Sequence, residues 1–291
     1  MMRRIYSLYL RITKGVLRRL FYFFFGYFSK VVLRIADVVH YRRFLVPLAR
    51  DFIQRARGYS YEFQVNGEYE LVQKVVSRFE NLVFFDVGAN VGDYCSTVLM
   101  ASENGAIAHL FDLDSELNSK TVQRFKGLNV RVNNFGLSNR NEQIAYSRFP
   151  DFPAVNSLLE IEFSHLTKVV VQAEVRTGDS YCTDLGIGRI NFLKMDVEGW
   201  ERFALEGFAE MLSANSIDAL TWEYGYTTAE THWTTRDFYK YLEEKGYVCG
   251  VVRKQGIDFR PWEYDLNDYT SGPNFFACLP AHKDYFNLLS G

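Results

Sequence analysis

Short apolar runs alternate with longer amphipathic stretches along this chain. Five mostly apolar runs read as strands of a parallel sheet that is buried on both faces. They cover residues 82–85, 106–111, 130–134, 190–195 and 217–222. Asp86 comes directly after the first run, and Gly88 and Gly92 follow within seven residues. We therefore take this first run as the strand around which the fold is organised.

The stretches between these runs have the three- and four-residue spacing of helices. They cover residues 68–79, 93–100, 235–245 and a segment that begins at Asp114 or Ser115 and ends near Lys126. Strands that alternate with helices imply an α/β fold with a doubly wound, mostly parallel sheet.

Three further strands break this alternation. Residues 143–147 and 169–171 read as a hairpin, and Asn156 and Ser157 lie in the loop between them, where they could face the site. Residues 247–252 and 274–279 have no helical pattern between them, so we expect these last two strands to pair antiparallel.

Residues 5–38 form one long helical pattern, with apolar residues at steps of three or four and most basic residues off that stripe. The longest uncharged run, residues 20–29, is far shorter than the roughly 20 residues of a spanning helix. No small-residue cleavage site of a signal peptide follows it. Two interpretations stay open: a basic amphipathic helix on a membrane surface, or a helix packed on the domain or on a second subunit.

Charge separates this arm from the rest of the chain. Residues 1–58 hold 13 Lys/Arg and 2 Asp/Glu, a balance of +11, whereas the remaining residues hold 20 and 33, a balance of −13. We therefore expect a basic arm over residues 1–58 and a separate domain over residues 59–291. The acidic body argues against a nucleic-acid partner, and the arm suits peripheral contact with an anionic membrane.

The four cysteines lie far apart, and no C-x-x-C pair exists. This spacing predicts neither a zinc site nor a disulfide framework. We expect a reducing, cytoplasmic setting, extended to the inner face of a membrane if the arm binds lipid.

The stretch from Asp86 to Gly92 has the layout of a nucleotide site, strand then glycine turn then helix. A dinucleotide site needs G-x-G-x-x-G, but here Gly88 and Gly92 are four residues apart. A carboxylate just before the turn would repel a pyrophosphate. It would suit a positively charged cofactor such as S-adenosylmethionine.

Asp112 follows the second strand, twenty residues after Gly92. An acid at that strand end could accept hydrogen bonds from ribose hydroxyls, as an adenosine cofactor requires. A role as helix N-cap is the alternative, but Asp114 or Ser115 is better placed for capping.

Three motifs in this order resemble the FkbM family of S-adenosylmethionine-dependent methyltransferases. They are residues 86–92, Phe111-Asp112, and Leu193-Lys-Met-Asp-Val-Glu-Gly-Trp-Glu201, and the resemblance covers roughly residues 65–280. It implies a Rossmann-like class I sheet of seven strands. It also implies that Asp86, Gly88, Ala89 and Asn90 contact the methionine part of the cofactor and that Asp112 holds the ribose. Our predicted cofactor site further includes Gly92 of the glycine turn and Ser138.

Two departures from the family pattern stand out. The second motif commonly reads F-E-P in the family, whereas this chain has Phe111-Asp112-Leu113. The segment after the third strand often reads L-S-D, whereas this chain has Leu137-Ser138-Asn139.

Methyl transfer to a hydroxyl needs a positioned proton acceptor. Asp196 and Glu198 follow the fourth strand, and His232 lies in a loop after the fifth, so these three are our candidate catalytic residues. Glu223 is a second-rank candidate. With Asp196 and Glu198 it could offer oxygens to magnesium, but our prediction includes no metal.

The sequence thus predicts an O-methyltransferase that acts on a small-molecule or glycan acceptor, such as a sugar or a glycolipid precursor. The alternatives are a nucleotide-dependent oxidoreductase or epimerase, and a non-catalytic membrane-associated module with the same fold. A homodimer is compatible with the arm.

Overall fold

The computed structural model describes residues 23, 26–28, 30–31, 42–56, 63–102, 105–267 and 274–287. The chain divides into two units, residues 1–53 and 54–291. Most of the helix predicted over residues 5–38 lies outside the described residues. Among the described residues, no helix has the length and apolar character needed to cross a membrane.

Helix α2 (Arg42–Ala56) carries most of the described residues of the first unit. Apolar side chains along it are exposed: Val46 at 63%, Leu48 at 53% and Phe52 at 72%. This helix therefore presents apolar surface that the first unit does not bury.

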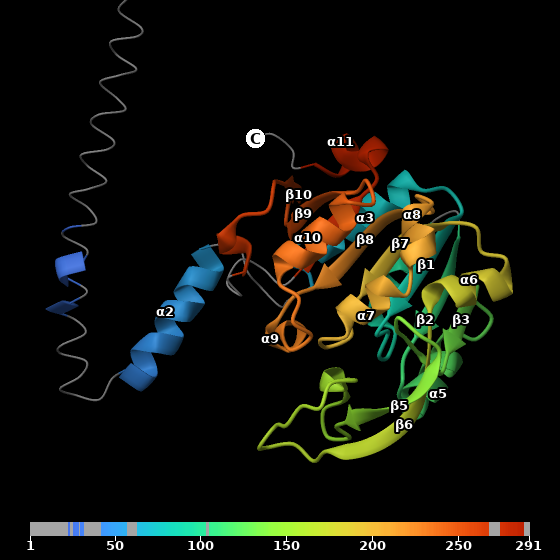
Figure 1. The fold of residues 1–291 in the computed structure, drawn as a ribbon, viewed down its shortest axis with the longest axis horizontal. Helices are drawn as coiled ribbons and strands as arrows, with labels where there is room; N and C mark the ends of the chain where they lie inside the picture. The colour runs from blue at the N-terminus through green and yellow to red at the C-terminus, as the bar shows by residue number, and fades with distance from the viewer. Residues whose placement is uncertain are drawn as a thin grey trace, which may run out of the picture. The chain divides into compact units, whose positions relative to one another are not determined.

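A large sheet forms the centre of the second unit (Figure 1). Its strand order is β10-β9-β11-β8-β7-β1-β2-β3. The strands are β1 (Leu82–Val87), β2 (Ala106–Phe111), β3 (Val130–Asn133), β7 (Ile190–Met195), β8 (Ile217–Glu223), β9 (Val248–Arg253), β10 (Gly256–Phe259) and β11 (Asn274–Cys278). Strands β3, β2, β1, β7 and β8 are parallel to one another, whereas β11 is antiparallel to both β8 and β9.

Helices cover both faces of this sheet and define two apolar cores. One core combines alternate strand side chains such as Phe85 with Phe208, Phe238 and Leu242 of the helical layer. The other combines Phe84 and its neighbours with helix side chains on the opposite face. The helices are α3 (Glu68–Arg78), α4 (Asp93–Ala101), α5 (Ser115–Arg124), α6 (Gly178–Leu185), α7 (Glu201–Glu206), α8 (Ala209–Ser213), α9 (Tyr226–Ala229), α10 (Thr235–Glu243) and α11 (Lys283–Phe286), with 3-10 turns η1 (Pro153–Val155), η2 (Tyr264–Asn267) and η3 (Pro280–His282).

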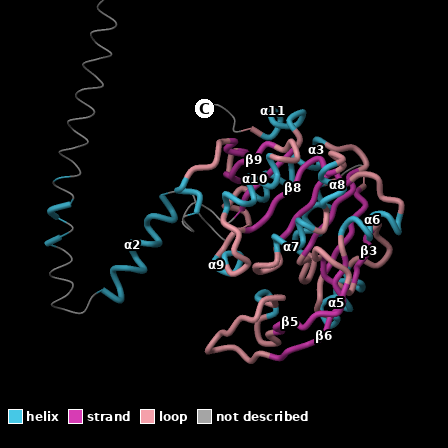
Figure 2. The backbone as a smooth tube through the Cα atoms, in the orientation of Figure 1, coloured by secondary structure: helices cyan, strands magenta, loops and turns pink. Residues whose placement is uncertain are grey.

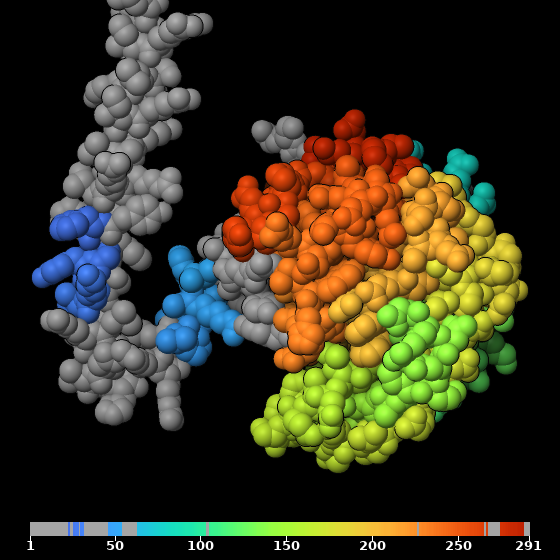
Figure 3. All heavy atoms as spheres, in the orientation of Figure 1, coloured from blue at the N-terminus to red at the C-terminus, as the bar shows by residue number. Residues whose placement is uncertain are grey.

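A second, small sheet follows β3 along the chain and consists of β4 (Gly136–Leu137), β5 (Glu142–Arg148) and β6 (Val169–Arg176). Its order is β4-β6-β5, with β5 and β6 antiparallel. Figure 2 shows β5 and β6 apart from the strands of the large sheet. Figure 3 shows the green residues of this part of the chain at one side of the second unit. The hairpin predicted over residues 143–147 and 169–171 is confirmed.

The predicted class, an α/β fold with a Rossmann-like, mostly parallel sheet, is confirmed, and so is the antiparallel pairing of the last strands. The described sheet has eight strands rather than the seven expected, because β10 forms a short hairpin with β9 at the edge. That hairpin has only four residues on its second strand and a tight turn at residues 254–255, so its apolar pattern is weak.

Candidate active site

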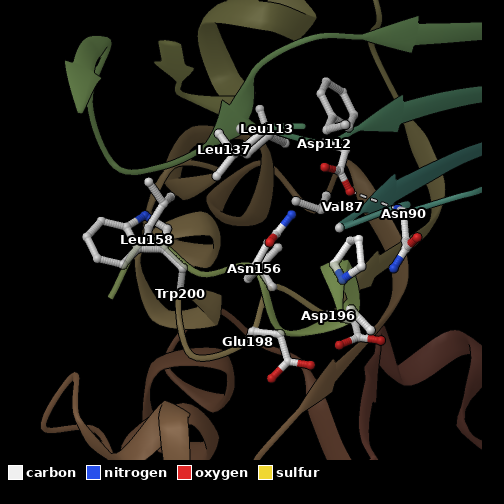
Figure 4. A pocket seen from close by; sticks show the side chains of 16 residues that line it. Val87, Asn90, Asp112, Leu113, Leu137, Asn156, Leu158, Asp196, Glu198 and Trp200 are labelled. Carbon is white, nitrogen blue, oxygen red and sulfur yellow. Dashed lines mark hydrogen bonds between the residues drawn. The ribbon is translucent and has the colours of Figure 1, made fainter. Parts of the chain in front are cut away.

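A cavity opens where β1, β2 and β7 end, the edge at which open α/β sheets bind ligands. Figure 4 shows its side chains converging from these strand ends and from the loop after β5. The lining residues are Val87, Gly88, Asn90, Phe111, Asp112, Leu113, Gly136, Leu137, Pro153, Ala154, Asn156, Leu158, Asp196, Val197, Glu198 and Trp200.

The glycine turn after β1 is shaped by the neighbouring strand ends. Gly88 has φ +82, and a Cβ on it would lie 1.8 Å from the carbonyl oxygen of Asp196. The N–H groups of Gly88 and Ala89 both donate to the carbonyl oxygen of Phe111, at 2.9 and 3.1 Å. Backbone contacts between strands therefore require glycine at position 88, whatever a ligand needs.

The predicted cofactor residues of this turn differ in their access to the cavity. Gly88 and Asn90 line it, whereas Ala89 and Gly92 do not. Gly92 has φ +80, and a Cβ on it would lie 2.5 Å from the ring of Phe125. Its role is to let the start of α4 pack closely against that ring.

Asp112 reaches the cavity from the end of β2. Its Oδ2 accepts a hydrogen bond from the N–H of Asn90 at 2.8 Å (Figure 4), and its Oδ1 accepts one from the N–H of Asp114 at 2.9 Å. Burial raises the pKa of Asp112 to about 6, although these two N–H groups favour the ionised form. Each oxygen keeps acceptor capacity after these bonds, so the carboxylate suits a diol such as ribose.

Asp86 lies beneath the cavity instead of lining it. Its side chain is fully buried, and neither carboxylate oxygen has a hydrogen-bond donor of good geometry among the described residues. Its nearest cation is Lys194, whose Nζ lies 3.5 Å from Oδ1. Burial raises the pKa of Asp86, and the Lys194 ammonium partly opposes that rise.

Lys194 contacts both the buried Asp86 and Asp196, which lines the cavity. Its Nζ lies 3.2 Å from Oδ2 of Asp196 and 5.1 Å from the centre of the Tyr94 ring. Burial would lower the pKa of Lys194, but the charges of Asp196, Asp86 and Glu68 outweigh it, and the pKa is raised. Sequence reasoning did not single out Lys194, although a charged residue inside a buried strand is itself a signal.

Three carboxyl groups converge at the acidic end of the cavity, where Asp196 and Glu198 line it and Glu223 lies outside the lining. Asp196, Glu198 and Glu223 each offer an oxygen, and these oxygens lie within 4.8 Å of one another. This set could hold a divalent cation through oxygen ligands, or it could share protons. Proton sharing requires that the three carboxyl groups have different pKa values.

The pKa shifts of these groups do differ. Burial raises the pKa of Asp196, but the Lys194 ammonium and a hydrogen bond from Glu223 outweigh it, and the net shift is downward. Burial and the charge of Asp196 raise the pKa of Glu223 well above its usual value. Burial, together with the charges of Asp196 and Glu201, raises the pKa of Glu198 to about 8. Asp196 is therefore the member of the cluster that ionises most readily.

The loop that carries Glu198 is held by residues outside the cavity. Glu201 is buried, and its Oε1 accepts hydrogen bonds from the N–H groups of Val197 at 3.0 Å and Gly199 at 3.3 Å. The hydroxyl of Ser157 donates to the carbonyl oxygen of Glu198 at 2.7 Å. Sequence reasoning placed Ser157 only in a nearby loop and gave Glu201 no role.

The two remaining predicted residues lie outside the cavity lining. His232 is exposed and has φ +63 in the turn after α9. Ser138 is buried, and its hydroxyl accepts a hydrogen bond from Nε1 of Trp200 at 3.2 Å. Ser138 therefore acts on the cavity through the orientation of Trp200.

Comparison with known proteins identifies the family of this chain. The sequence profile described as "Methyltransferase FkbM domain" matches residues 86–249. No protein with a curated description matches the chain significantly.

Solved structures of methyltransferases resemble the fold at low identity. The FkbM methyltransferase of Methylobacillus flagellatus KT is 15% identical, with 84% of this chain and 60% of that chain covered and a TM-score of 0.45. An rRNA methylase of Streptococcus thermophilus is 12% identical, with 73% and 96% covered and a TM-score of 0.41. An S-adenosylmethionine-dependent O-methyltransferase of Thermotoga maritima is 12% identical, with 73% and 64% covered and a TM-score of 0.38.

Proposed function

The chain belongs to the FkbM family of methyltransferases, and on this premise we propose that it methylates a hydroxyl oxygen with S-adenosylmethionine as the methyl donor. The acceptor we propose is a sugar, a glycan or a glycolipid precursor. The observation that carries the proposal is the Asp196 carboxylate, which faces the cavity while Lys194 holds it ionised at 3.2 Å.

The described residues fit the proposed cofactor at two places. The Asp112 carboxylate would hold the ribose, because both of its oxygens keep acceptor capacity inside the cavity. The side chains of Leu113, Leu137, Leu158 and Trp200 form an apolar end of the cavity that suits a planar base (Figure 4). When bound, S-adenosylmethionine supplies a methyl group on a positively charged sulfur.

The acidic end of the cavity, at Asp196 and Glu198, would bind the methyl acceptor. A hydroxyl loses its proton when its oxygen is methylated, and a positioned carboxylate can take that proton. Asp196 is the ionised member of its cluster, and the raised pKa of Glu223 leaves that neighbour able to donate a hydrogen bond to it. The role of Asp196 is therefore to orient the acceptor hydroxyl and to receive its proton.

The arm supports a further part of the proposal. Val46, Leu48 and Phe52 expose apolar surface on α2, and residues 1–58 carry a net charge of +11. A basic segment with exposed apolar side chains gains from both lipid head groups and acyl chains. We propose peripheral contact with an anionic membrane, where a lipid-linked acceptor would be found.

The test is Asp196→Asn, which keeps the side-chain volume and removes the charge. Transfer of a radiolabelled methyl group to a panel of sugars and lipid-linked glycans should fall about a hundredfold or more. Affinity for S-adenosylhomocysteine, measured by calorimetry, should change little. Asp184→Asn is the control, because that exposed carboxylate pairs with Arg176 outside the cavity. Full transfer by Asp196→Asn would contradict the assignment of the base.

A further inference from the structure

The backbone at Glu198 is unusual. Glu198 has φ +51 and Gly199 has φ +106, so two successive residues adopt the left-handed conformation. This conformation is disfavoured for a residue with a side chain, and it persists only where the surroundings enforce it. It directs the Glu198 carboxyl group into the cavity beside Asp196 (Figure 4).

Ser157 holds this turn from outside its own loop. Its hydroxyl donates to the carbonyl oxygen of Glu198 at 2.7 Å and accepts from the N–H of Leu159 at 3.0 Å. A hydroxyl has one proton to donate, and the Ser157 hydroxyl donates it in a hydrogen bond to the backbone carbonyl oxygen of Glu198. Ser157 is 1% exposed, so water does not compete for this bond.

Ser157 is itself fixed by its backbone. Its N–H and carbonyl groups both pair with Ser147 of β5, at 3.1 and 2.8 Å. The preceding residue, Asn156, donates to Asp114 at 3.3 Å and accepts from the N–H of Phe149 at 2.8 Å. The loop after β5 is thus attached to the small sheet and to α5, so it can impose a position on Glu198.

We propose that Ser157 is a positioning residue whose hydroxyl holds the Glu198 backbone in its left-handed conformation, and thereby places the Glu198 carboxyl group beside Asp196 and Glu223. The inference rests on the proposed function, because it assigns to that carboxyl group a place next to the positive charge of the methyl donor. The loop after β5 then influences the acidic end of the cavity through the Ser157 side chain.

Ser147 of β5, the backbone partner of Ser157, provides a matched control. It is also buried, and its hydroxyl also donates to a backbone carbonyl, that of Leu159 at 3.0 Å. Within the described part of the chain, its side chain makes no hydrogen bond to residues 196–201. Ser147→Ala and Ser157→Ala therefore each remove a buried hydroxyl that donates to a backbone carbonyl, and only the second hydroxyl bonds to Glu198.

The experiment compares two ligands by calorimetry at a pH above 8, where Glu198 with its raised pKa of about 8 is ionised, and it needs no acceptor. S-adenosylhomocysteine has a neutral sulfur, whereas sinefungin carries a protonated amine at the position of the transferred methyl group. The ratio of their dissociation constants reports negative charge near that position. Ser157→Ala should lower the sinefungin preference about fivefold, the effect of one ordinary hydrogen bond, while Ser147→Ala leaves it unchanged. Ser157→Cys, which keeps the volume with a weaker donor, gives the same test if Ser157→Ala does not fold.

Glu198→Gln identifies the group through which Ser157 acts. This variant should itself lose sinefungin preference, and adding Ser157→Ala to it should cause no further loss. An equal loss in both backgrounds, or equal effects of Ser157→Ala and Ser147→Ala, would overturn the inference while the methyltransferase proposal stands. Wild-type protein that binds neither ligand would refute the proposed function, and the inference with it.

Discussion

Replacing Lys194 with Met tests the buried charges beneath the cavity. The Nζ of Lys194 lies between Oδ1 of Asp86 and Oδ2 of Asp196, at 3.5 and 3.2 Å. Asp86 is fully buried, and among the described residues no other cation is recorded within ion-pair distance of it. Methionine keeps the length of the side chain, so the variant removes the charge with little change in volume.

The expected loss of stability is large. Removing one partner of a buried ion pair costs about 3–5 kcal/mol, because the other charge is left without compensation. For a domain of this size one kcal/mol shifts Tm by about 2–4 °C, so Tm should fall by roughly 6–20 °C.

The loss should also depend on pH. Burial already raises the pKa of Asp86, and without Lys194 the pKa rises further. Between the ordinary carboxyl pKa and the raised pKa of Asp86, the folded variant binds a proton that the unfolded chain has already released. The free energy of unfolding of the variant therefore falls as pH rises through this interval. The deficit relative to wild type should therefore be larger at pH 8 than at pH 5.

Thermal unfolding followed by circular dichroism at both pH values measures this effect. Lys240→Met is the control, because that lysine is exposed and its Nζ lies 3.9 Å from Glu244, a pair worth little. Asp86→Asn combined with Lys194→Met should recover much of the loss, since no uncompensated charge remains at Asp86. An equal deficit at both pH values, or a double variant less stable than Lys194→Met, would refute the reasoning.

Three further outcomes are expected. Asp112→Ala should weaken S-adenosylhomocysteine binding roughly tenfold or more in calorimetry through lost charge-assisted hydrogen bonds; unchanged affinity would place the ribose elsewhere. Gly88→Ala should prevent folding, seen as loss of soluble protein, because its Cβ would lie 1.8 Å from the Asp196 carbonyl oxygen; a soluble variant with wild-type Tm would contradict that steric argument. Removing residues 1–58 should keep S-adenosylhomocysteine binding but abolish co-sedimentation with anionic vesicles, and high salt should weaken binding of the full chain. A full chain that ignores vesicles and forms a dimer split by this truncation would make the arm an oligomerisation element.

Strand positions could be predicted because burial on both faces leaves continuous apolar segments, and β2 and β7 begin and end where expected. Strand β10 could not be predicted, because its pattern is too short to differ from a loop. The N-cap role of Asp114 could be predicted from its place before a helix, and its side chain accepts from the N–H groups of Glu116 and Leu117.

The site was predictable where a polar residue ends a strand, and Asp112 and Asp196 both line the cavity. The position of Asp86 depends on register, which the sequence does not reveal: Asp86 and Lys194 are partners in the pairing of β1 with β7. The contact of Ser157 with Glu198 joins segments 41 residues apart, so only the folded chain brings it about.

The place of β11 in the sheet has a consequence for the order of assembly. Strand β8 ends at Glu223, but the strand that covers its edge begins only at Asn274. During synthesis β8 therefore presents an open edge, and β9 has only β10 as a neighbour until residues 274–278 insert between β8 and β9. Open edges of apolar strands invite pairing with other chains. A nascent chain that stalls between β9 and β11 would be the form most exposed to aggregation and most dependent on chaperones.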